Sequence, residues 1–260
     1  MKKAIALLLA LALSLTAFSA LAEDALARIQ AQGYMVFGTE GNWAPWTVFE
    51  NGEWSGFDIE VARAVCEKLG VEARFVGGEW SGLLMGLANG MYDSMANGVD
   101  VTEERQQTYD FSDPYCFNRT ALIVREDNDS LTSFEGLAGK TTANSPNSTY
   151  MLLAEQYGAT VLGVEDLAGT MSLVADNRVD ATLNAEASFY DYMAAMPDAP
   201  LKIAAVHEEV TSVAFPLQKG EDRASLREAI NQAIAELRAE GVLAAISEKY
   251  FGGDLTTPAE

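Results

Sequence analysis

The chain is poor in the residues from which most catalytic and metal sites are built. Its 260 residues include one histidine, His207, and two cysteines, Cys66 and Cys116. There is no CxxC pair and no Cys/His cluster, which argues against a zinc site. A Ser-His-Asp triad would have to use His207, and neither a G-x-S-x-G elbow nor a Walker A phosphate loop is present. We therefore expect no cofactor and interpret His207 as a surface or hinge residue.

Basic residues are also scarce. Lys and Arg number 17 against 38 Asp and Glu, which gives a net charge of −21 at pH 7. A strongly acidic chain is repelled by nucleic acid and by anionic membrane surfaces. We therefore expect no nucleic-acid partner.

A long apolar run occurs only at the beginning of the chain. Lys2 and Lys3 precede an apolar stretch over residues 4–17, and small residues then lead to Ala22. This order predicts a cleavable secretory signal peptide over residues 1–22, and the stretch is shorter than the roughly 20 residues of a membrane span. We expect a periplasmic or secreted protein without a lipid anchor. In such a compartment Cys66 and Cys116 could form a disulfide or remain buried thiols, and both alternatives stay open.

Strand and helix patterns alternate through the rest of the chain. The first unit has predicted strands at 35–39, 71–76 and 92–96 and predicted helices at 57–69 and 83–88. A second unit repeats the pattern, with strands at 120–125, 140–143, 160–164 and 180–183 and helices at 150–157, 167–176 and 189–196. Strands that alternate with helices indicate parallel sheets covered by helices, and hence an α/β fold.

The last segment predicts how the two units are connected. Residues 223–249 form a long amphipathic pattern, interrupted at Gly241, that should pack back on the first unit. The second unit would then be an insertion. We predict a lobe 1 of residues 23–116 and 212–260, a lobe 2 of residues 117–211, and a ligand cleft between them.

Several short motifs follow one another at characteristic spacing. They are Gly38-Thr39-Glu40-Gly41, Gly56-Phe57-Asp58-Ile59-Glu60-Val61, Asn89-Gly90-Met91-Tyr92-Asp93, Thr102-Glu103-Glu104-Arg105, Asp110-Phe111-Ser112-Asp113-Pro114-Tyr115 and Lys249-Tyr250-Phe251-Gly252. In these motifs the chain resembles the bacterial extracellular solute-binding proteins of family 3, which bind polar amino acids for ABC transporters. The resemblance covers essentially the whole chain after the leader.

This resemblance implies a fold and a mode of action. The fold would be the two-lobed, type II periplasmic-binding-protein fold, in which helices flank a mixed or parallel sheet in each lobe. The protein would be a monomer that captures a polar amino acid by hinge closure and delivers it to a membrane permease. Cofactors are not part of this mechanism.

Arg105 is the first candidate binding residue. A guanidinium group can hold a carboxylate through two hydrogen bonds, and every α-amino acid carries a carboxylate. By its position in the motif, Arg105 resembles the carboxylate-binding residue of the family. From the residues alone, a surface arginine paired with Glu103 or Glu104 is the alternative.

Other candidate residues of lobe 1 also come from the resemblance. Positions that match cleft positions of the family are Glu40, Trp43, Trp80, Asn97, Gly98 and Asp100. Aromatic faces can pack on a ligand or attract its ammonium group, and Gly98 permits close backbone approach. Trp46 matches a supporting position and is expected in the core. Ordinary roles are the alternatives: a turn at Gly98, and at Asp100 a helix cap or a salt bridge to Arg105.

Lobe 2 should contribute a polar loop before a helix. The loop supplies Ser145, Ser148, Thr149 and Tyr150, and free backbone N–H groups at the start of a helix can hold an anion. Helix capping by Ser148 or Thr149 is the alternative, and both roles can coexist. This segment looks most like the cystine-binding branch of the family.

The chain departs from the family pattern at Ala185. Many members carry an Asp there, which pairs with the α-ammonium group of the ligand. An unpaired buried charge is costly, so we expect Glu186 or Asp100 to replace it. This departure leaves two alternatives to an amino-acid receptor: a protein that binds small carboxylic acids, or a dehydratase-like enzyme on the same fold.

Overall fold

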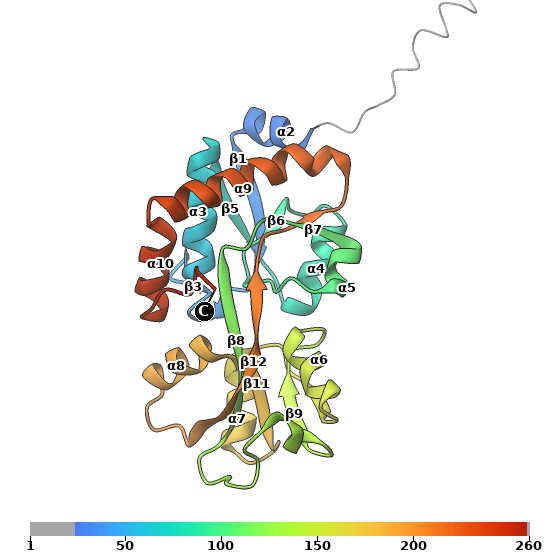
Figure 1. The fold of residues 1–260 in the computed structure, drawn as a ribbon, viewed down its shortest axis with the longest axis vertical. Helices are drawn as coiled ribbons and strands as arrows, with labels where there is room; N and C mark the ends of the chain where they lie inside the picture. The colour runs from blue at the N-terminus through green and yellow to red at the C-terminus, as the bar shows by residue number, and fades with distance from the viewer. Residues whose placement is uncertain (1–23, 259–260) are drawn as a thin grey trace, which may run out of the picture.

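The computed structural model describes residues 24–258 as a two-lobed α/β protein (Figure 1). The predicted signal peptide, residues 1–22, lies outside the described residues. Two long strands, β8 (Cys116–Arg125) and β12 (Leu201–Val213), run between the lobes side by side. We keep the names lobe 1 and lobe 2 for the two halves that these strands connect.

Lobe 1 is built on a parallel three-stranded sheet. Its order is β5 (Glu72–Gly77), β1 (Tyr34–Thr39) and β6 (Ser94–Met95). A small antiparallel sheet packs beside it and contains β2 (Asn42–Trp43), β3 (Thr47–Glu50) and β4 (Glu53–Ser55). A further antiparallel pair joins β7 (Tyr109–Phe111) to β13 (Pro216–Gln218), so the chain returns to lobe 1 after β12.

The helices of lobe 1 are α2 (Ala25–Gln32), α3 (Phe57–Leu69), α4 (Trp80–Ala88), α5 (Glu103–Thr108), α9 (Ala224–Ala239) and α10 (Val242–Phe251). The predicted helices at 57–69 and 83–88 and over the C-terminal segment are present, and two further helices, α2 and α5, were not predicted. Helix α3 has the predicted bounds and ends because Gly70 adopts the left-handed conformation. The long C-terminal pattern is two helices, since Gly241 has a φ of 75° between them. As predicted, α9 and α10 pack on α3.

Lobe 2 contains a mixed five-stranded sheet of order β10-β9-β11-β8-β12. Its remaining strands are β9 (Thr141–Asn144), β10 (Thr160–Gly163) and β11 (Ala181–Ala185), and its helices are α6 (Thr149–Gln156), α7 (Leu167–Ala175) and α8 (Glu186–Ala195). Strands β9, β10 and β11 are parallel to one another, whereas β8 runs antiparallel to β11 and β12. A 3₁₀ turn spans Phe134–Leu137.

The sequence reasoning missed strand β12. The predicted lobe 2 ends at residue 211 with no strand after 180–183, but β12 begins at Leu201 and pairs with β8 from Cys116↔Val213 to Arg125↔Leu201. Its pairing shifts between Val206 and Val210, where the polar residues His207-Glu208-Glu209 interrupt the alternation of apolar side chains. This irregularity removed the period-two signal on which strand prediction depends.

The described part of the molecule also settles three smaller points. Cys66 and Cys116 are both buried and free, so the thiol alternative holds. His207 lies in β12. Its ring Nε2 and the Tyr157 hydroxyl form a 3.1 Å hydrogen bond, and the ring packs edge-on against Phe134. Within residues 24–258, none of the helices has the length and apolar character needed to cross a membrane.

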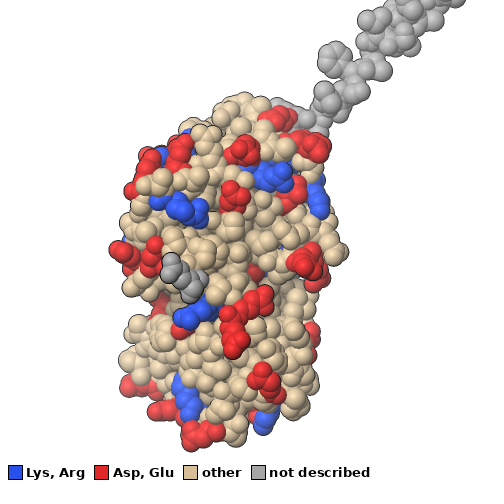
Figure 2. All heavy atoms as spheres, in the orientation of Figure 1, with Lys and Arg blue, Asp and Glu red and all other residues tan. Residues whose placement is uncertain are grey.

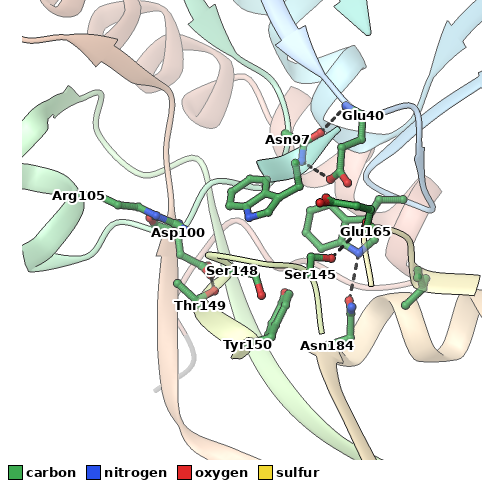
Figure 3. A pocket seen from close by; sticks show the side chains of 14 residues that line it. Glu40, Asn97, Asp100, Arg105, Ser145, Ser148, Thr149, Tyr150, Glu165 and Asn184 are labelled. Carbon is green, nitrogen blue, oxygen red and sulfur yellow. Dashed lines mark hydrogen bonds between the residues drawn. The ribbon is translucent and has the colours of Figure 1, made fainter. Parts of the chain in front are cut away.

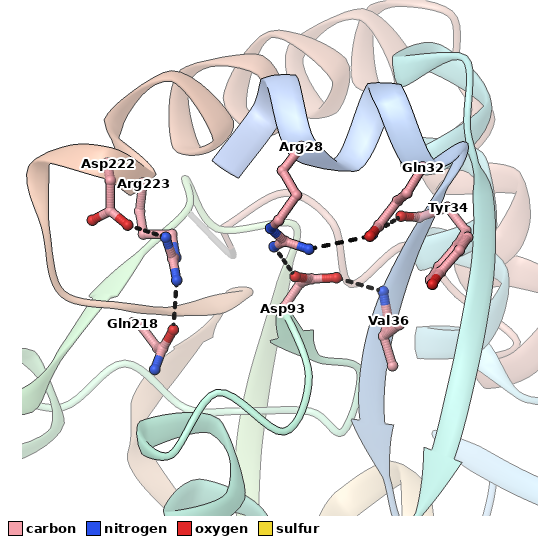
Figure 4. A network of polar contacts seen from close by, with 8 residues as sticks. All are labelled: Arg28, Gln32, Tyr34, Val36, Asp93, Gln218, Asp222 and Arg223. Atoms are coloured by element: carbon pink, nitrogen blue, oxygen red, sulfur yellow. Dashed lines mark hydrogen bonds and ion pairs between the residues drawn. The ribbon is translucent and has the colours of Figure 1, made fainter. Parts of the chain in front are cut away.

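A polar network fixes helix α2 to the sheet of lobe 1. Arg28 of α2 pairs with Asp93, and the Asp93 carboxylate accepts a 2.8 Å hydrogen bond from the Val36 backbone (Figure 4). Because Val36 belongs to β1, this network holds α2 against the central strand of lobe 1.

Figure 2 shows acidic side chains spread over both lobes on the visible face, as expected for a strongly acidic chain.

Candidate functional site

A cavity lies between the lobes, where small-molecule sites commonly occur (Figure 3). Lobe 1 and lobe 2 both contribute to its wall. The lining residues are Glu40, Trp43, Trp80, Asn97, Gly98, Asp100, Arg105, Ser145, Ser148, Thr149, Tyr150, Glu165, Leu167 and Asn184.

Arg105 supplies a buried cation to one side of the cavity. It sits in α5, whose first turn is capped by the Thr102 hydroxyl accepting from the Arg105 backbone N–H at 3.1 Å. Only 8% of Arg105 is exposed, and its guanidinium lies over the Trp80 ring at 5.2 Å. Nη1 donates to the Asp100 carbonyl at 2.9 Å, whereas the buried Nη2 has no partner in the described structure. Such a group is poised to bind a carboxylate.

Asp100 places a carboxylate beside this cation. Its two oxygens accept hydrogen bonds from the Thr149 hydroxyl at 2.5 Å and from the Thr211 hydroxyl at 2.9 Å. Burial raises the pKa of Asp100, and burial lowers the pKa of Arg105. Because Thr149 belongs to lobe 2, Asp100 also connects the lobes. The helix cap is made by Thr102, so Asp100 does not have the alternative role of capping α5.

Gly98 forms part of the cavity floor. It has a φ of 54°, and a Cβ atom there would lie 2.6 Å from the Trp43 ring. Its backbone N–H donates to the buried carboxylate of Asp58, a residue of the motif that begins α3. The motif therefore holds the loop on which Gly98 and Asp100 lie.

Glu40 and Glu165 lie on the other side of the cavity. The Glu40 carboxylate accepts a 2.6 Å hydrogen bond from Nδ2 of Asn97, and Oδ1 of Asn97 accepts one of 2.7 Å from the Glu40 backbone N–H. Burial raises the pKa of Glu40 to about 7, and the negative charges of Glu165 and Asp166 act in the same direction. Both glutamates therefore contribute negative charge to a confined space.

Aromatic and apolar side chains complete the wall. Trp43 stacks on the fully buried Trp46 with 5.2 Å between ring centroids, so Trp46 has the supporting role that we predicted. The Trp43 Nε1–H donates to Oδ1 of Asn184 at 3.0 Å. Because Asn184 belongs to β11 in lobe 2, this bond also joins the two lobes.

The loop before α6 adopts the predicted helix-start geometry. The Ser148 hydroxyl accepts from the Met151 backbone N–H at 3.0 Å and caps α6. The Ser145 hydroxyl donates to the Glu165 carbonyl at 3.2 Å, which ties this loop to the one after β10. Tyr150 reaches the cavity while its hydroxyl accepts a 3.1 Å hydrogen bond from Nδ2 of Asn118.

The structure brings eleven of the twelve predicted residues to the cavity and leaves out Glu186. Glu186 begins α8, where its carboxylate pairs with Arg119 at 2.7 Å on another surface. Ala185 is fully buried and does not line the cavity. Sequence reasoning missed Glu165, Leu167 and Asn184.

No group of three or more His, Cys, Asp or Glu side chains in residues 24–258 is arranged to hold a metal ion. The chemistry of the described cavity is instead a set of charged, hydrogen-bonding and aromatic groups. Such a set can recognise a small zwitterion.

Comparison with known proteins identifies the family. Residues 35–253 match the bacterial extracellular solute-binding proteins, family 3. The chain belongs to this family. A family 3 relative from Haemophilus influenzae, named a probable amino-acid ABC transporter-binding protein, is 35% identical over 88% of this chain and 89% of the relative. Family and relatives are substrate-binding proteins of amino-acid ABC transporters rather than enzymes.

Two solved structures of similar proteins are informative together. The L-cystine solute receptor of Neisseria gonorrhoeae, in its unliganded open conformation, is 36% identical and gives a TM-score of 0.61 over 90% of this chain and 99% of its own. An ancestral arginine-binding protein bound to arginine is 32% identical and gives a TM-score of 0.79, covering 85% of this chain and 99% of its own. The liganded protein is thus the better geometric match despite its lower identity. The lobes of the present structure are correspondingly joined by hydrogen bonds across the cavity.

Proposed function

We propose that this protein is an extracytoplasmic receptor that captures one free polar α-amino acid and delivers it to the permease of an ABC transporter. One observation carries the proposal: the buried guanidinium of Arg105, whose Nη2 has no partner among the described residues, faces a cavity that also contains the Asp100 carboxylate. A cation and an anion side by side match the carboxylate and ammonium groups shared by all α-amino acids. The family membership supports the same role.

Asp100 is the proposed partner of the ligand's α-ammonium group. It replaces the aspartate that many family members carry at the position of Ala185. Of the three carboxylates that line the cavity, Asp100 is the one labelled beside Arg105 in Figure 3, while Glu40 and Glu165 lie on the opposite side. The ligand's head group therefore lies between α5 and the start of α6.

Binding is proposed to occur by hinge closure on strands β8 and β12. The ligand would first contact Arg105 and Asp100 in lobe 1, and lobe 2 would then cover it with Thr149, Tyr150 and Asn184. Closure shields the ligand from water and strengthens its polar contacts. The closed form is the species that the permease would recognise.

A thermal-shift experiment tests this function. The mature protein is unfolded, freed of bound ligand and refolded, and its melting temperature is recorded with each common amino acid and cystine. A ligand present at about 100 times its Kd adds roughly 2.7 kcal/mol, which raises the melting temperature by about 5–10 °C at this size. The shift should vanish in Arg105→Ala and persist in Arg119→Ala, which removes an arginine outside the cavity.

Two results would contradict the proposal. One is the absence of a shift with any amino acid, and the other is an unchanged shift in Arg105→Ala. Chemical conversion of an added carboxylic acid, followed by NMR, would instead support the dehydratase-like alternative. Delivery is tested separately, by whether the liganded receptor stimulates ATP hydrolysis by its reconstituted transporter and the ligand-free receptor does not.

A further inference from the structure

The side of the cavity away from Arg105 is acidic and receives one carboxylate from each lobe. Glu40 follows β1 in lobe 1, and Glu165 follows β10 in lobe 2. Figure 3 shows the Glu165 side chain directed toward that of Glu40, on the opposite side from Asp100 and Arg105. Closing the lobes therefore brings two carboxylates together.

Neither carboxylate has a cationic partner in the part of the chain that the structure describes. Among residues 24–258, no Lys, Arg or His forms an ion pair with Glu40 or Glu165. Glu40 has the amide of Asn97 as a donor, whereas the buried Oε2 of Glu165 has no hydrogen-bond partner within the same described residues. A buried carboxylate oxygen without a donor is costly. The cavity thus has an unmet requirement for donors at this end.

The charges of the cavity can be balanced against those of an amino acid. Arg105 and Asp100 offset the carboxylate and ammonium of the head group, so that end is neutral overall. Glu40 and Glu165 remain, and above pH 7, where Glu40 is ionised, a neutral side chain would leave two negative charges facing each other in a closed space. A cationic side chain would relieve both charges and supply the missing donors.

The rest of the wall suits such a side chain. Trp43 presents an aromatic ring and Leu167 an apolar side chain to the cavity. These groups can pack on an aliphatic stem, and an aromatic face also attracts a cation. A ligand with a second zwitterionic head would fit less well, because its second carboxylate would lie against the two glutamates.

We infer that the ligand is an α-amino acid whose side chain ends in a cation, an ammonium or guanidinium group, bound between Glu40 of lobe 1 and Glu165 of lobe 2. This inference rests on the proposed function and specifies its ligand class. Glu165 is then a specificity-determining residue, and it contacts the cation only when the lobes close. A neutral side chain would leave the two carboxylates opposed and closure unfavourable.

Calorimetry on stripped protein tests the inference at pH 8, where Glu40 is ionised. Arginine and citrulline form a matched pair, because the cationic guanidinium of arginine is replaced in citrulline by a neutral ureido group of similar shape. Lysine, ornithine, glutamine and cystine complete the panel. We expect arginine or another cationic ligand to bind at least about 30-fold more tightly than citrulline, as expected for a charge-assisted contact in place of a neutral one.

The variant Glu165→Gln examines the lobe 2 carboxylate. It should lower the arginine-to-citrulline affinity ratio by about tenfold or more while citrulline binding stays the same or improves. Glu155→Gln is the matched control, because Glu155 is an exposed carboxylate on α6 of the same lobe and does not line the cavity. It should leave the ratio unchanged.

The outcomes separate this inference from the function on which it rests. Citrulline, glutamine or cystine binding as tightly as the cationic ligands, through a site that still needs Arg105, would overturn the ligand class and leave the receptor role intact. An equal loss for arginine and citrulline in Glu165→Gln would show that Glu165 is structural, which also overturns the inference. If no amino acid binds, the proposed function fails and the inference fails with it.

Discussion

Replacing Gly98 by alanine tests whether the cavity floor is fixed by backbone conformation and by Trp43. An alanine at a φ of 54° is in the left-handed region, which costs roughly 1–2 kcal/mol for a residue with a Cβ atom. The new Cβ would also lie 2.6 Å from the Trp43 ring and 3.1 Å from the Trp46 ring. Forcing such contacts in a packed region costs about 1–3 kcal/mol. Gly98→Ala should therefore lower the free energy of unfolding by about 2–5 kcal/mol.

Gly70→Ala is the matched control for the backbone contribution. Gly70 has a φ of 73°, and a Cβ atom there would have no atom within 4 Å. Gly70→Ala should lower the free energy of unfolding only by the roughly 1–2 kcal/mol that the left-handed conformation costs a residue with a Cβ atom, and it should bind ligand normally. Gly98→Ala should in addition bind at least about tenfold more weakly, since a displaced Trp43 cannot keep its bond to Asn184.

Urea unfolding of the stripped proteins and calorimetric titration with the ligand provide the two measurements. The reasoning is refuted if both variants lose the same stability and Gly98→Ala keeps its affinity. That result would mean that the Trp43 ring moves aside freely and does not fix the shape of the cavity.

Three further predictions follow from the contacts between and around the lobes. Asn184→Ala removes the acceptor of the Trp43 Nε1–H bond, so affinity measured by calorimetry should fall about fivefold, because such a bond contributes about 1 kcal/mol. Lowering the pH from 8 to 5 should favour the closed ligand-free form, because burial raises the pKa of Glu40 to about 7. At a pH between the usual pKa of 4.5 for a solvated glutamate and about 7, the closed form binds a proton on Glu40 that the open form does not. This proton uptake stabilises the closed form, and the stabilisation is lost as the pH rises through 7. Small-angle X-ray scattering should show a smaller radius of gyration at pH 5, and Glu40→Gln should weaken this dependence, with Asp100 accounting for a remainder because burial also raises its pKa. Arg119→Ala should change the free energy of unfolding by less than about 1 kcal/mol and leave affinity unaltered, because this arginine is 54% exposed and its ion pair lies outside the cavity.

The lobe 1 half of the cavity was predictable because Glu40 and Arg105 lie in motifs and the other candidates match family positions around these motifs. Arg105 stands at a fixed distance from Asn97 and Asp100, and the loop that carries them is short. Local chain geometry then leaves few ways to place these side chains. Periodicity located α3 for a similar reason, since its buried stripe repeats at helical spacing and Gly70 ends it.

The missed residues are defined by the sheet of lobe 2 instead. Glu165 follows β10 and Asn184 lies near the end of β11, just as Ser145, which was predicted, follows β9. These strands are parallel, so their carboxyl ends meet at one edge of the sheet and face the cleft. That rule could have identified Glu165 and Asn184 once the strands were predicted, whereas no motif marks them.

The prediction for Glu186 failed for a local reason. The sequence places it directly after Ala185, where a carboxylate for the ammonium group was expected. Helix α8 begins at Glu186 and turns its side chain toward Arg119, so the two neighbours differ in direction. A shift of one residue across the boundary between a strand and a helix is enough to move a side chain to another surface.

The position of α9 has a consequence for the order in which the protein can fold. All strands of the lobe 2 sheet lie within residues 116–213. In lobe 1, by contrast, α3 is covered by α9, which begins only at Ala224. During synthesis the lobe 2 sheet can therefore pair while the apolar face of α3 still lacks its cover. Contacts between segments this far apart in sequence close slowly, and an uncovered apolar face promotes aggregation in the meantime. The cavity requires both lobes, so it is the last part of the molecule to form.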